Sequence, residues 1–157
     1  MTFESGARGA ACMNGDERPT LLLVDDDPEH NLALAKVLVG AGYRVHISTG
    51  GHEALTLLKE GRFDLVIMDL RMPSRSGLDL LRNIRAMTLL IPVVVITVHG
   101  EWTSYMEAMN IGAVDYLTKP VRRGDILTTI RKALARRGIR PPDVPPDASE
   151  EAGDAAA

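Results

Sequence analysis

The sequence of 157 residues has one cysteine, and only 4% of its residues are aromatic. A lone cysteine, Cys12, excludes an internal disulfide and a metal site built from clustered cysteines. No apolar run approaches the roughly 20 residues of a membrane-spanning helix, and residues 1–20 lack the apolar stretch of a secretory signal. These absences predict a cytoplasmic protein that does not insert into a membrane.

A strong charge of either sign is also missing. The net charge is -3, of which residues 141–157 contribute -5 and residues 1–18 contribute -1. Residues 19–140 therefore carry +3. That excess is too small for the concentrated basic face that nucleic-acid binding requires, so no direct contact with nucleic acid is expected.

The two ends of the chain differ in composition from its middle. Residues 1–18 are rich in Gly and Ala, and residues 141–157 combine four prolines with an acidic, alanine-rich end. Neither end has periodic apolar positions, so a disordered leader and a disordered tail are predicted. Residues 19–140 have the length of one domain with a full-sized core.

Short apolar runs recur along the middle of the chain. The continuous runs at residues 21–24, 65–68 and 93–96 are typical of strands buried on both faces of a parallel sheet. Residues 44–47 alternate between apolar and polar, which favours an edge strand. Residues 114–117 form a fifth, shorter candidate.

Segments with helical periodicity separate these strands. Asp27 is predicted to cap the first helix, whose first turn begins with Pro28, and Gly42 and Gly138 stand where helices usually end. Residues 102–111 carry the weakest helical pattern. The alternation predicts an α/β fold with a doubly wound, five-stranded parallel sheet, for which 2-1-3-4-5 is a common strand order.

Polar side chains follow four of the predicted strands: Asp25, Asp26 and Asp27 follow the first, Asp69 the third, Thr97 the fourth and Lys119 the fifth. Ligands of doubly wound sheets bind beyond the carboxyl ends of the strands. Carboxylates gathered there repel one another unless a cation lies among them, and their hard oxygen atoms favour Mg2+. We therefore predict a Mg2+ site at this edge of the sheet.

A lysine and a hydroxyl at the same edge would complete a cradle for a phosphoryl group, because phosphoryl transfer depends mainly on positioning and charge neutralisation. Asp69 is then the nucleophile that accepts the group. Taken singly, each residue has an ordinary interpretation. The Asp triplet is a turn and a helix cap, Asp69 a turn residue, Thr97 a strand residue and Lys119 a surface lysine. Their meeting at one edge favours the phosphoryl site.

Four segments resemble the receiver domains of bacterial two-component response regulators, in the same order and at the same spacing. They are "LLLVDDDPEH", "DLVIMDLRMPSRSGLDLL", "PVVVITVHG" and "GAVDYLTKPV". The resemblance covers about residues 19–137. It implies a flavodoxin-like receiver fold in a single-domain phosphoprotein of phosphorelay signal transduction.

The resemblance also implies how the site is loaded. Asp69 matches the residue that takes a phosphoryl group from a phosphohistidine of a sensor histidine kinase or phosphotransfer protein. Asp26, Asp69 and the backbone carbonyl of Arg71 match the Mg2+ ligands. Asp25 completes the acidic pocket through water, and Lys119 pairs with the phosphoryl group.

Further matches concern the switch that follows phosphorylation. Thr97 matches the switch hydroxyl, and Tyr116 matches the aromatic residue whose rotamer follows it. Pro120 matches a proline that often follows the lysine through a cis peptide bond. The switching face is expected on the fourth helix, fifth strand and fifth helix, where a downstream protein or a second copy would bind. On that face, Met106 and Met109 are expected to pack in the core.

Two features depart from the family pattern or lie outside it. Val98 stands where the family commonly has Ala or Gly, and its branched side chain would crowd the phosphoryl site. His30, His46, His52 and His99 show no metal-ligand spacing. Only His99 is placed near the pocket mouth, and exposure to solvent is the ordinary expectation even there.

Four functions remain open from the sequence. The leading hypothesis is a phosphorylation-controlled binding module, whose own catalysis is limited to phosphorylating and dephosphorylating itself and which is otherwise not an enzyme. It could instead relay its phosphoryl group onward, or serve as a degenerate receiver that acts as an unphosphorylated scaffold. The fourth function is a metal-dependent phosphatase of the haloacid-dehalogenase type. Such enzymes have a D-x-D-x-T pattern on the first strand, and "DDDPE" lacks its threonine.

Overall fold

Five parallel strands form one sheet in the computed structural model, which describes residues 18–70, 77–87, 91–98 and 102–142. The strands are β1 (Thr20–Val24), β2 (Arg44–Ser48), β3 (Leu65–Asp69), β4 (Val93–Val98) and β5 (Asp115–Lys119). Their order across the sheet is β2-β1-β3-β4-β5. This order confirms the predicted topology and leaves β2 as an edge strand.

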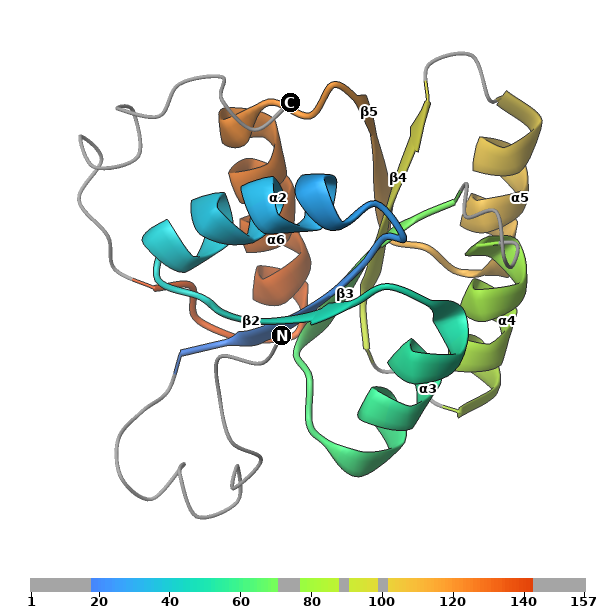
Figure 1. Cartoon of the computed structure of the whole chain (residues 1–157), viewed down its shortest axis with the longest axis horizontal. Coiled ribbons are helices and arrows are strands. Elements are labelled where there is room, and N and C mark those ends of the chain that lie inside the picture. Colours follow the sequence, from blue (N-terminus) through green and yellow to red (C-terminus); the bar gives the residue numbers. More distant parts are fainter. Residues whose placement is uncertain (1–17, 71–76, 88–90, 99–101, 143–157) are drawn as a thin grey trace.

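Helices cover both faces of the sheet (Figure 1). They are α2 (Pro28–Gly40), α3 (Gly51–Glu60), α4 (Gly77–Met87), α5 (Trp102–Ile111) and α6 (Arg123–Arg136). Helices α2 and α6 lie on one face, and α3, α4 and α5 lie on the other. The weak helical pattern of residues 102–111 is therefore confirmed as a helix.

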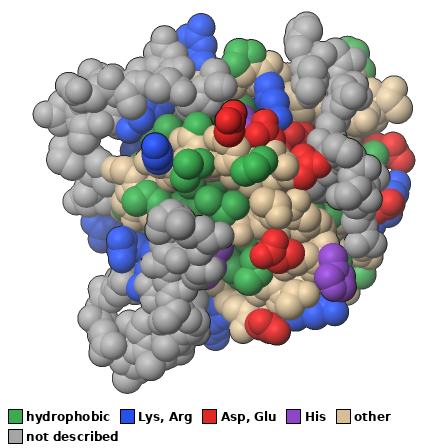
Figure 2. Space-filling view, viewed as in Figure 1, with side chains coloured by type: hydrophobic (Ala, Val, Ile, Leu, Met, Phe, Trp, Pro, Cys, Tyr) green, Lys and Arg blue, Asp and Glu red, His purple; other side chains and the backbone are tan. Residues whose placement is uncertain are grey.

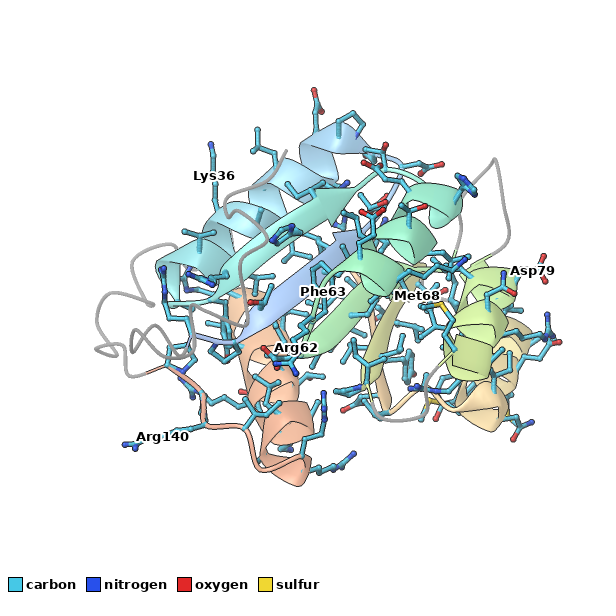
Figure 3. The ribbon with its side chains drawn as sticks, turned by 90° about the horizontal axis from the view of Figure 1, so that it is seen from below. Lys36, Arg62, Phe63, Met68, Asp79 and Arg140 are labelled. Atoms are coloured by element: carbon cyan, nitrogen blue, oxygen red, sulfur yellow. The ribbon has the colours of Figure 1, made fainter. Side chains whose placement is uncertain are left out.

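The side chains of each central strand alternate between two cores. Leu21 and Leu23 of β1 pack with α2 and α6, whereas Leu22 packs in the opposite core with α3, α4 and α5. Figure 3 shows Met68 of β3 on the side of α4, and Lys36 of α2 directed away from the sheet. Burial on both faces explains why these strands are continuous apolar runs.

The ends of the helices follow the predicted signals. The Asp27 carboxylate accepts hydrogen bonds from the backbone N–H groups of Glu29 (3.1 Å) and His30 (3.4 Å), which caps α2. Gly42 and Gly138 have φ angles of 99° and 76°, a conformation that favours glycine. They follow α2 and α6 closely and let the chain turn back toward the sheet.

Two predictions need correction. The last strand spans Asp115–Lys119 rather than residues 114–117, because its pairing with β4 continues past the apolar residues. Met106 is 57% exposed and does not pack in the core, whereas Met109 packs against the core beside α3 and α4. A single residue of α5, Ala108, is buried, so this helix turns most of its surface away from the sheet.

Several predictions concern residues that the structure does not describe. Nearly all of the predicted leader and tail lies outside the described residues, as do Arg71 and His99 and the side chain of Val98. Across the described ranges, no helix has both the length and the apolar character of a membrane span.

Candidate functional site

Three strand ends bring two carboxylates and a lysine together. Lys119 Nζ lies 2.6 Å from Asp69 Oδ2 and 3.6 Å from Asp25 Oδ2. Asp25 and Asp69 are each 3% exposed. The parallel strands β1, β3 and β5 end at the same edge of the sheet, so the predicted meeting of these three side chains is confirmed.

The loop after β1 is fixed by hydrogen bonds to Asp25. Asp25 Oδ1 accepts a hydrogen bond from the backbone N–H of Asp27 at 3.0 Å, and Asp25 Oδ2 lies 2.6 Å from His30 Nδ1. The side-chain amide of Asn31 donates to the Asp25 carbonyl at 2.6 Å. The start of α2 is thereby tied to the end of β1, and Figure 2 shows acidic side chains gathered near that point.

The sequence analysis missed a histidine of this pocket. His30 contacts Asp25 with a side chain only 12% exposed, and His99, which was expected near the pocket mouth, lies outside the described residues. The available signal was the helix cap: because Asp27 caps α2, residue 30 lies in the first turn, directly above the strand end. The spacing of metal ligands in the sequence could not reveal this histidine, because it contacts a carboxylate from the first turn of a helix.

The charges of the pocket shift one another's pKa values. Burial raises the pKa of Asp25, but hydrogen bonds from His30 and the Asp27 N–H, with the charge of Lys119, bring it below its usual value. Burial also lowers the pKa of Lys119, yet its hydrogen bond and attraction to Asp69 outweigh this and raise it. Both groups therefore remain charged at neutral pH.

The pKa of Asp26 shifts in the opposite direction to that of Asp25. Desolvation and then repulsion from Asp25, with a smaller contribution from Asp69, raise the pKa of Asp26 above its usual value. Negative charge around Asp26 is therefore not fully neutralised by the positive groups of the protein. A cation bound beside Asp26 would relieve this repulsion.

The available oxygen donors suit Mg2+ better than a metal bound only by side chains. Among the described residues, no three His, Cys, Asp or Glu side chains form a group that could hold a metal ion. Mg2+ binds through one or two carboxylates and keeps several waters, so it does not need such a group. Asp26 and Asp69 would supply such carboxylates, and the predicted carbonyl ligand of Arg71 lies outside the described residues.

Thr97 and Tyr116 occupy the same side of the sheet. Tyr116 pairs in register with Val95, two residues before Thr97, and its partly buried side chain packs against the core on the side of α4 and α5. Thr97 is 1% exposed, and its hydroxyl has no hydrogen-bond partner within the part of the chain that the structure describes. A buried hydroxyl without a partner is costly, so a group that could accept its hydrogen bond would stabilise this strand end.

An aromatic stack connects this side of the sheet to the surface. The rings of Tyr116 and Tyr105 lie 4.0 Å apart, and those of Tyr105 and Trp102 lie 5.0 Å apart. Trp102 is 66% exposed. The stack therefore extends from β5 to the outer surface of α5.

The backbone around the site is closely packed. The Lys119–Pro120 peptide bond is cis, as the resemblance implies. Gly77, the first residue of α4, donates a hydrogen bond from its N–H to the Leu70 carbonyl at 3.1 Å. A Cβ on Gly77 would lie 2.6 Å from Leu70 Cα and 2.8 Å from the Asp69 carbonyl oxygen, so no larger residue fits beside Asp69.

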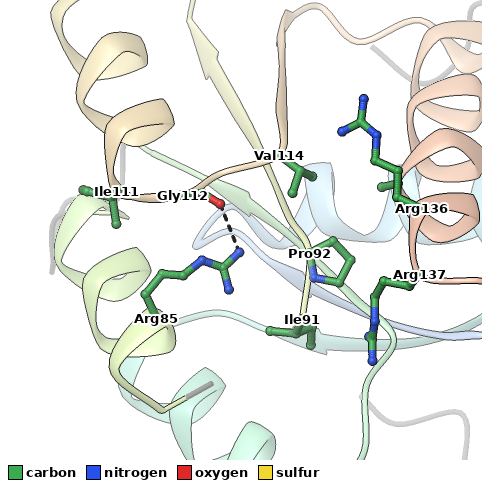
Figure 4. A pocket seen from close by; sticks show the side chains of 9 residues that line it. Arg85, Ile91, Pro92, Ile111, Gly112, Val114, Arg136 and Arg137 are labelled. Carbon is green, nitrogen blue, oxygen red and sulfur yellow. Dashed lines mark hydrogen bonds between the residues drawn. The ribbon is translucent and has the colours of Figure 1, made fainter. Parts of the chain in front are cut away.

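A cavity of about 310 Å³ lies near the opposite ends of β4 and β5 (Figure 4). Pro92 and Val114, which directly precede these strands, line it together with apolar and arginine side chains. In it, Arg85 Nη2 donates a hydrogen bond to the Gly112 carbonyl at 3.1 Å. The cavity's lining, as far as the structure describes it, includes no carboxylate, and the cavity lies at the opposite end of these strands from the acidic pocket.

Residues 21–131 match the family model of the response regulator receiver domain. The transcriptional regulatory protein ZraR of Escherichia coli O157:H7 is 38% identical over 125 residues, which cover 80% of this chain and 28% of ZraR. The uncharacterized transcriptional regulatory protein YkoG of Bacillus subtilis is 34% identical over 128 residues, which cover 82% of this chain and 56% of YkoG. The chain thus spans only part of the length of these curated relatives.

Solved structures give the same result. The CheY-like receiver domain protein of Methanospirillum hungatei has a TM-score of 0.74 and 26% identity, covering 77% of this chain and 97% of its own. The receiver domain protein of Clostridium thermocellum has a TM-score of 0.73 and 32% identity, covering 76% of this chain and 97% of its own. FixJ-N has a TM-score of 0.71 and 35% identity, covering 74% of this chain and 94% of its own.

Proposed function

We propose that this chain, which belongs to the response regulator receiver domain family, is loaded with a phosphoryl group on Asp69. Receiver domains act in two-component signalling, where they interact with histidine kinases and downstream effectors. The proposed donor is a phosphohistidine of a sensor histidine kinase or phosphotransfer protein, which places the reaction in the cytoplasm. The single observation that carries the proposal is the contact of 2.6 Å between Lys119 and the buried Asp69 carboxylate, beside Asp25.

In the proposed reaction, an Asp69 carboxylate oxygen attacks the phosphorus atom of the phosphohistidine. An O–P bond forms and the N–P bond breaks, and the donor imidazole keeps the electron pair and takes a proton from water. Lys119 holds the attacking carboxylate in place and then lies beside the transferred group, where its charge offsets the added negative charge. Both functions require a lysine that stays protonated, which its raised pKa supports.

Receiver domains generally bind Mg2+ at their acidic site. Here Asp26 and Asp69 would hold the ion, which when bound neutralises charge on the phosphoryl oxygens. Asp25 would contribute by holding water and by keeping the local charge negative. The raised pKa of Asp26 supports a cation at this place.

The hydroxyl of Thr97 supplies a donor for the phosphorylated state. Its burial without a partner in the described part of the chain favours a hydrogen bond to a phosphoryl oxygen once one is present. Movement of Thr97 would then free space for Tyr116, whose ring would leave Tyr105. The face of α5, β5 and α6 would change shape and bind a downstream protein or a second copy. Its exposed residues include Trp102, Met106, Arg131 and Lys132.

Intact-protein mass spectrometry after incubation with acetyl phosphate and Mg2+ tests this function. The wild type should gain one phosphoryl group, Asp69→Asn should gain none, and the control Asp79→Asn on the exposed part of α4 should behave like the wild type. An unmodified wild type would instead favour an unphosphorylated scaffold. Transfer of the label onward to a phosphotransfer protein would favour a relay intermediate.

A further inference from the structure

Asp25 is held by two hydrogen bonds from its own segment of chain. His30 Nδ1 lies 2.6 Å from Asp25 Oδ2, and the backbone N–H of Asp27 donates to Asp25 Oδ1 at 3.0 Å. The His30 and Asp25 side chains are 12% and 5% exposed, so the contact is shielded from solvent. None of the roles proposed above uses His30.

We propose that His30 is a positioning residue of the Mg2+ pocket, which fixes the Asp25 carboxylate through a hydrogen bond from Nδ1. This inference rests on the proposed function of the same site. An ionised carboxylate only accepts hydrogen bonds, so the ring nitrogen that faces it carries the proton. A hydrogen bond to an ionised group is stronger than one between neutral groups, and exclusion of water strengthens it further.

Hydrogen bonds also hold the backbone at His30. Its backbone N–H donates to the Asp27 side chain, and the neighbouring Asn31 donates to the Asp25 carbonyl. These contacts fix the first turn of α2 over the end of β1. The His30 ring therefore reaches Asp25 from a backbone that is already ordered, so the contact costs side-chain entropy but little further backbone entropy.

His30 also affects how Lys119 is shared between the two acids. Lys119 Nζ lies 2.6 Å from Asp69 and 3.6 Å from Asp25, and both contacts involve an Oδ2 atom. Without His30, Asp25 Oδ2 would lose its nearest donor and would attract Lys119 more strongly. The lysine would then be drawn from Asp69, and the Asp25 carboxylate would be less available to water around the ion.

Calorimetric titration of the full chain with Mg2+ tests the proposal. Partners that hydrogen-bond metal ligands typically contribute 10–100-fold to metal affinity. Because Asp25 acts on the ion through water, His30→Leu should raise the Kd for Mg2+ by about 10-fold, the lower end of that range. His30→Asn should recover most of the affinity, because its amide nitrogen takes the place of Nδ1. The matched control is His52→Leu, in an exposed histidine of α3, which should leave the Kd unchanged.

Two further measurements separate positioning from folding. Thermal unfolding without Mg2+ should give similar midpoints for His30→Leu and His30→Asn, although their Mg2+ affinities differ. If His30→Leu fails to fold, His30→Gln replaces it, since its amide reaches beyond the Nδ1 position and should not restore affinity. In the metal-free wild type, nitrogen NMR should find the His30 proton on Nδ1.

The outcomes distinguish this inference from the proposed function. Wild-type protein that binds Mg2+, combined with an unchanged Kd in His30→Leu, would overturn the role of His30 and leave the proposed function intact. If His30→Asn and His30→Leu both fold and bind Mg2+ equally weakly, positioning through Nδ1 would be overturned. Wild-type protein that neither binds Mg2+ nor accepts a phosphoryl group would overturn the proposed function, and the role of His30 with it.

Discussion

Lys119 on β5 contacts Asp69 on β3 across the end of the intervening strand β4, with 2.6 Å between Nζ and Oδ2. The Asp69 side chain is only 4% exposed, whereas that of Lys119 is 27% exposed. The contact therefore joins a buried carboxylate to an ammonium group that retains access to solvent. Such a group can remain beside Asp69 while the carboxylate gains a phosphoryl group.

Replacing Lys119 should slow phosphorylation without preventing metal binding. In Lys119→Met, the charge that offsets the transferred group is lost, and removal of one such stabilising donor typically costs roughly 100–1000-fold in rate. The rate of adduct formation from acetyl phosphate measures the effect. Lys132→Met, in an exposed lysine of α6, is the control and should react at the wild-type rate. An unchanged rate in Lys119→Met would contradict the proposed role of the lysine.

Neutralising Asp26 should stabilise the metal-free protein. Because the folded-state pKa of Asp26 is raised, its ionised form opposes folding above that pKa, and the effect vanishes as pH falls below its unfolded value. Asp26→Asn should therefore gain roughly 0.2–1 kcal/mol at neutral pH, the range of partly exposed charge pairs. Urea unfolding with a chelator present measures this, and the gain should shrink as pH falls through the folded pKa.

Mg2+ should make the wild type more stable than Asp26→Asn. The wild type should gain stability when Mg2+ is added, whereas Asp26→Asn has lost a ligand charge and should gain much less. Asp79→Asn, outside the pocket, should respond like the wild type. An equal gain by all three proteins would show that Asp26 does not hold the ion.

The Asp25 pKa gives a second dependence on pH, with the opposite sign. Its folded-state pKa lies below its unfolded value, so ionised Asp25 contributes stability that is present above the unfolded pKa of about 3.9. That contribution is lost as pH falls through the folded pKa. Asp25→Asn should thus be less stable than the wild type at neutral pH and approach it in acid. A constant difference at every pH would contradict the depressed pKa.

Gly77→Ala should destabilise the protein by roughly 1–3 kcal/mol, the usual cost of overpacking. Its Cβ would lie 2.6 Å from Leu70 Cα and 2.8 Å from the Asp69 carbonyl oxygen, and backbone atoms have little freedom to move aside. Gly40→Ala, in α2, is the control because nothing lies within 4 Å of its Cβ, and it should be neutral or stabilising. Urea unfolding distinguishes them, and equal stability would show that the contact at Gly77 relaxes.

Trp102 fluorescence should report the switch. If Tyr116 turns toward Thr97, it leaves the Tyr105 ring that now lies 4.0 Å away, and Tyr105 in turn contacts Trp102. Beryllofluoride with Mg2+ should therefore change the emission of the wild type but not that of Asp69→Asn. Tyr105→Leu should reduce the change because it interrupts the stack. Identical spectra with and without beryllofluoride would leave the proposed output face unsupported.

The positions of Asp25, Asp69 and Lys119 were predictable because parallel strands fix where their carboxyl ends meet. An apolar run followed by an acid is then enough to place the acid at the edge of the sheet. Lys119 was predicted at that edge even though β5 was expected to end at residue 117. Backbone hydrogen bonds to β4 continue through Thr118 and Lys119, whose polarity hides the end of the strand in the sequence.

His30 and Met106 show what sequence patterns could not provide. Helical position places His30 in the first turn of α2, but its contact with Asp25 depends on how that turn sits over β1. Met106 is apolar at helical spacing, yet α5 buries only Ala108, so its neighbours in space decide its exposure. Both results depend on the packing of helices against the sheet, which the local sequence does not encode.

Peptide mapping can locate the phosphoryl group and thereby test Asp69 as its acceptor. After incubation with acetyl phosphate and Mg2+, borohydride reduces an acyl phosphate and converts the aspartate that carried it to homoserine. Homoserine is expected at position 69 in the wild type and at no other acidic position, with no conversion when acetyl phosphate is omitted. Conversion at Asp25 or Asp26, or an unmodified residue 69 in protein shown to bind Mg2+, would contradict it.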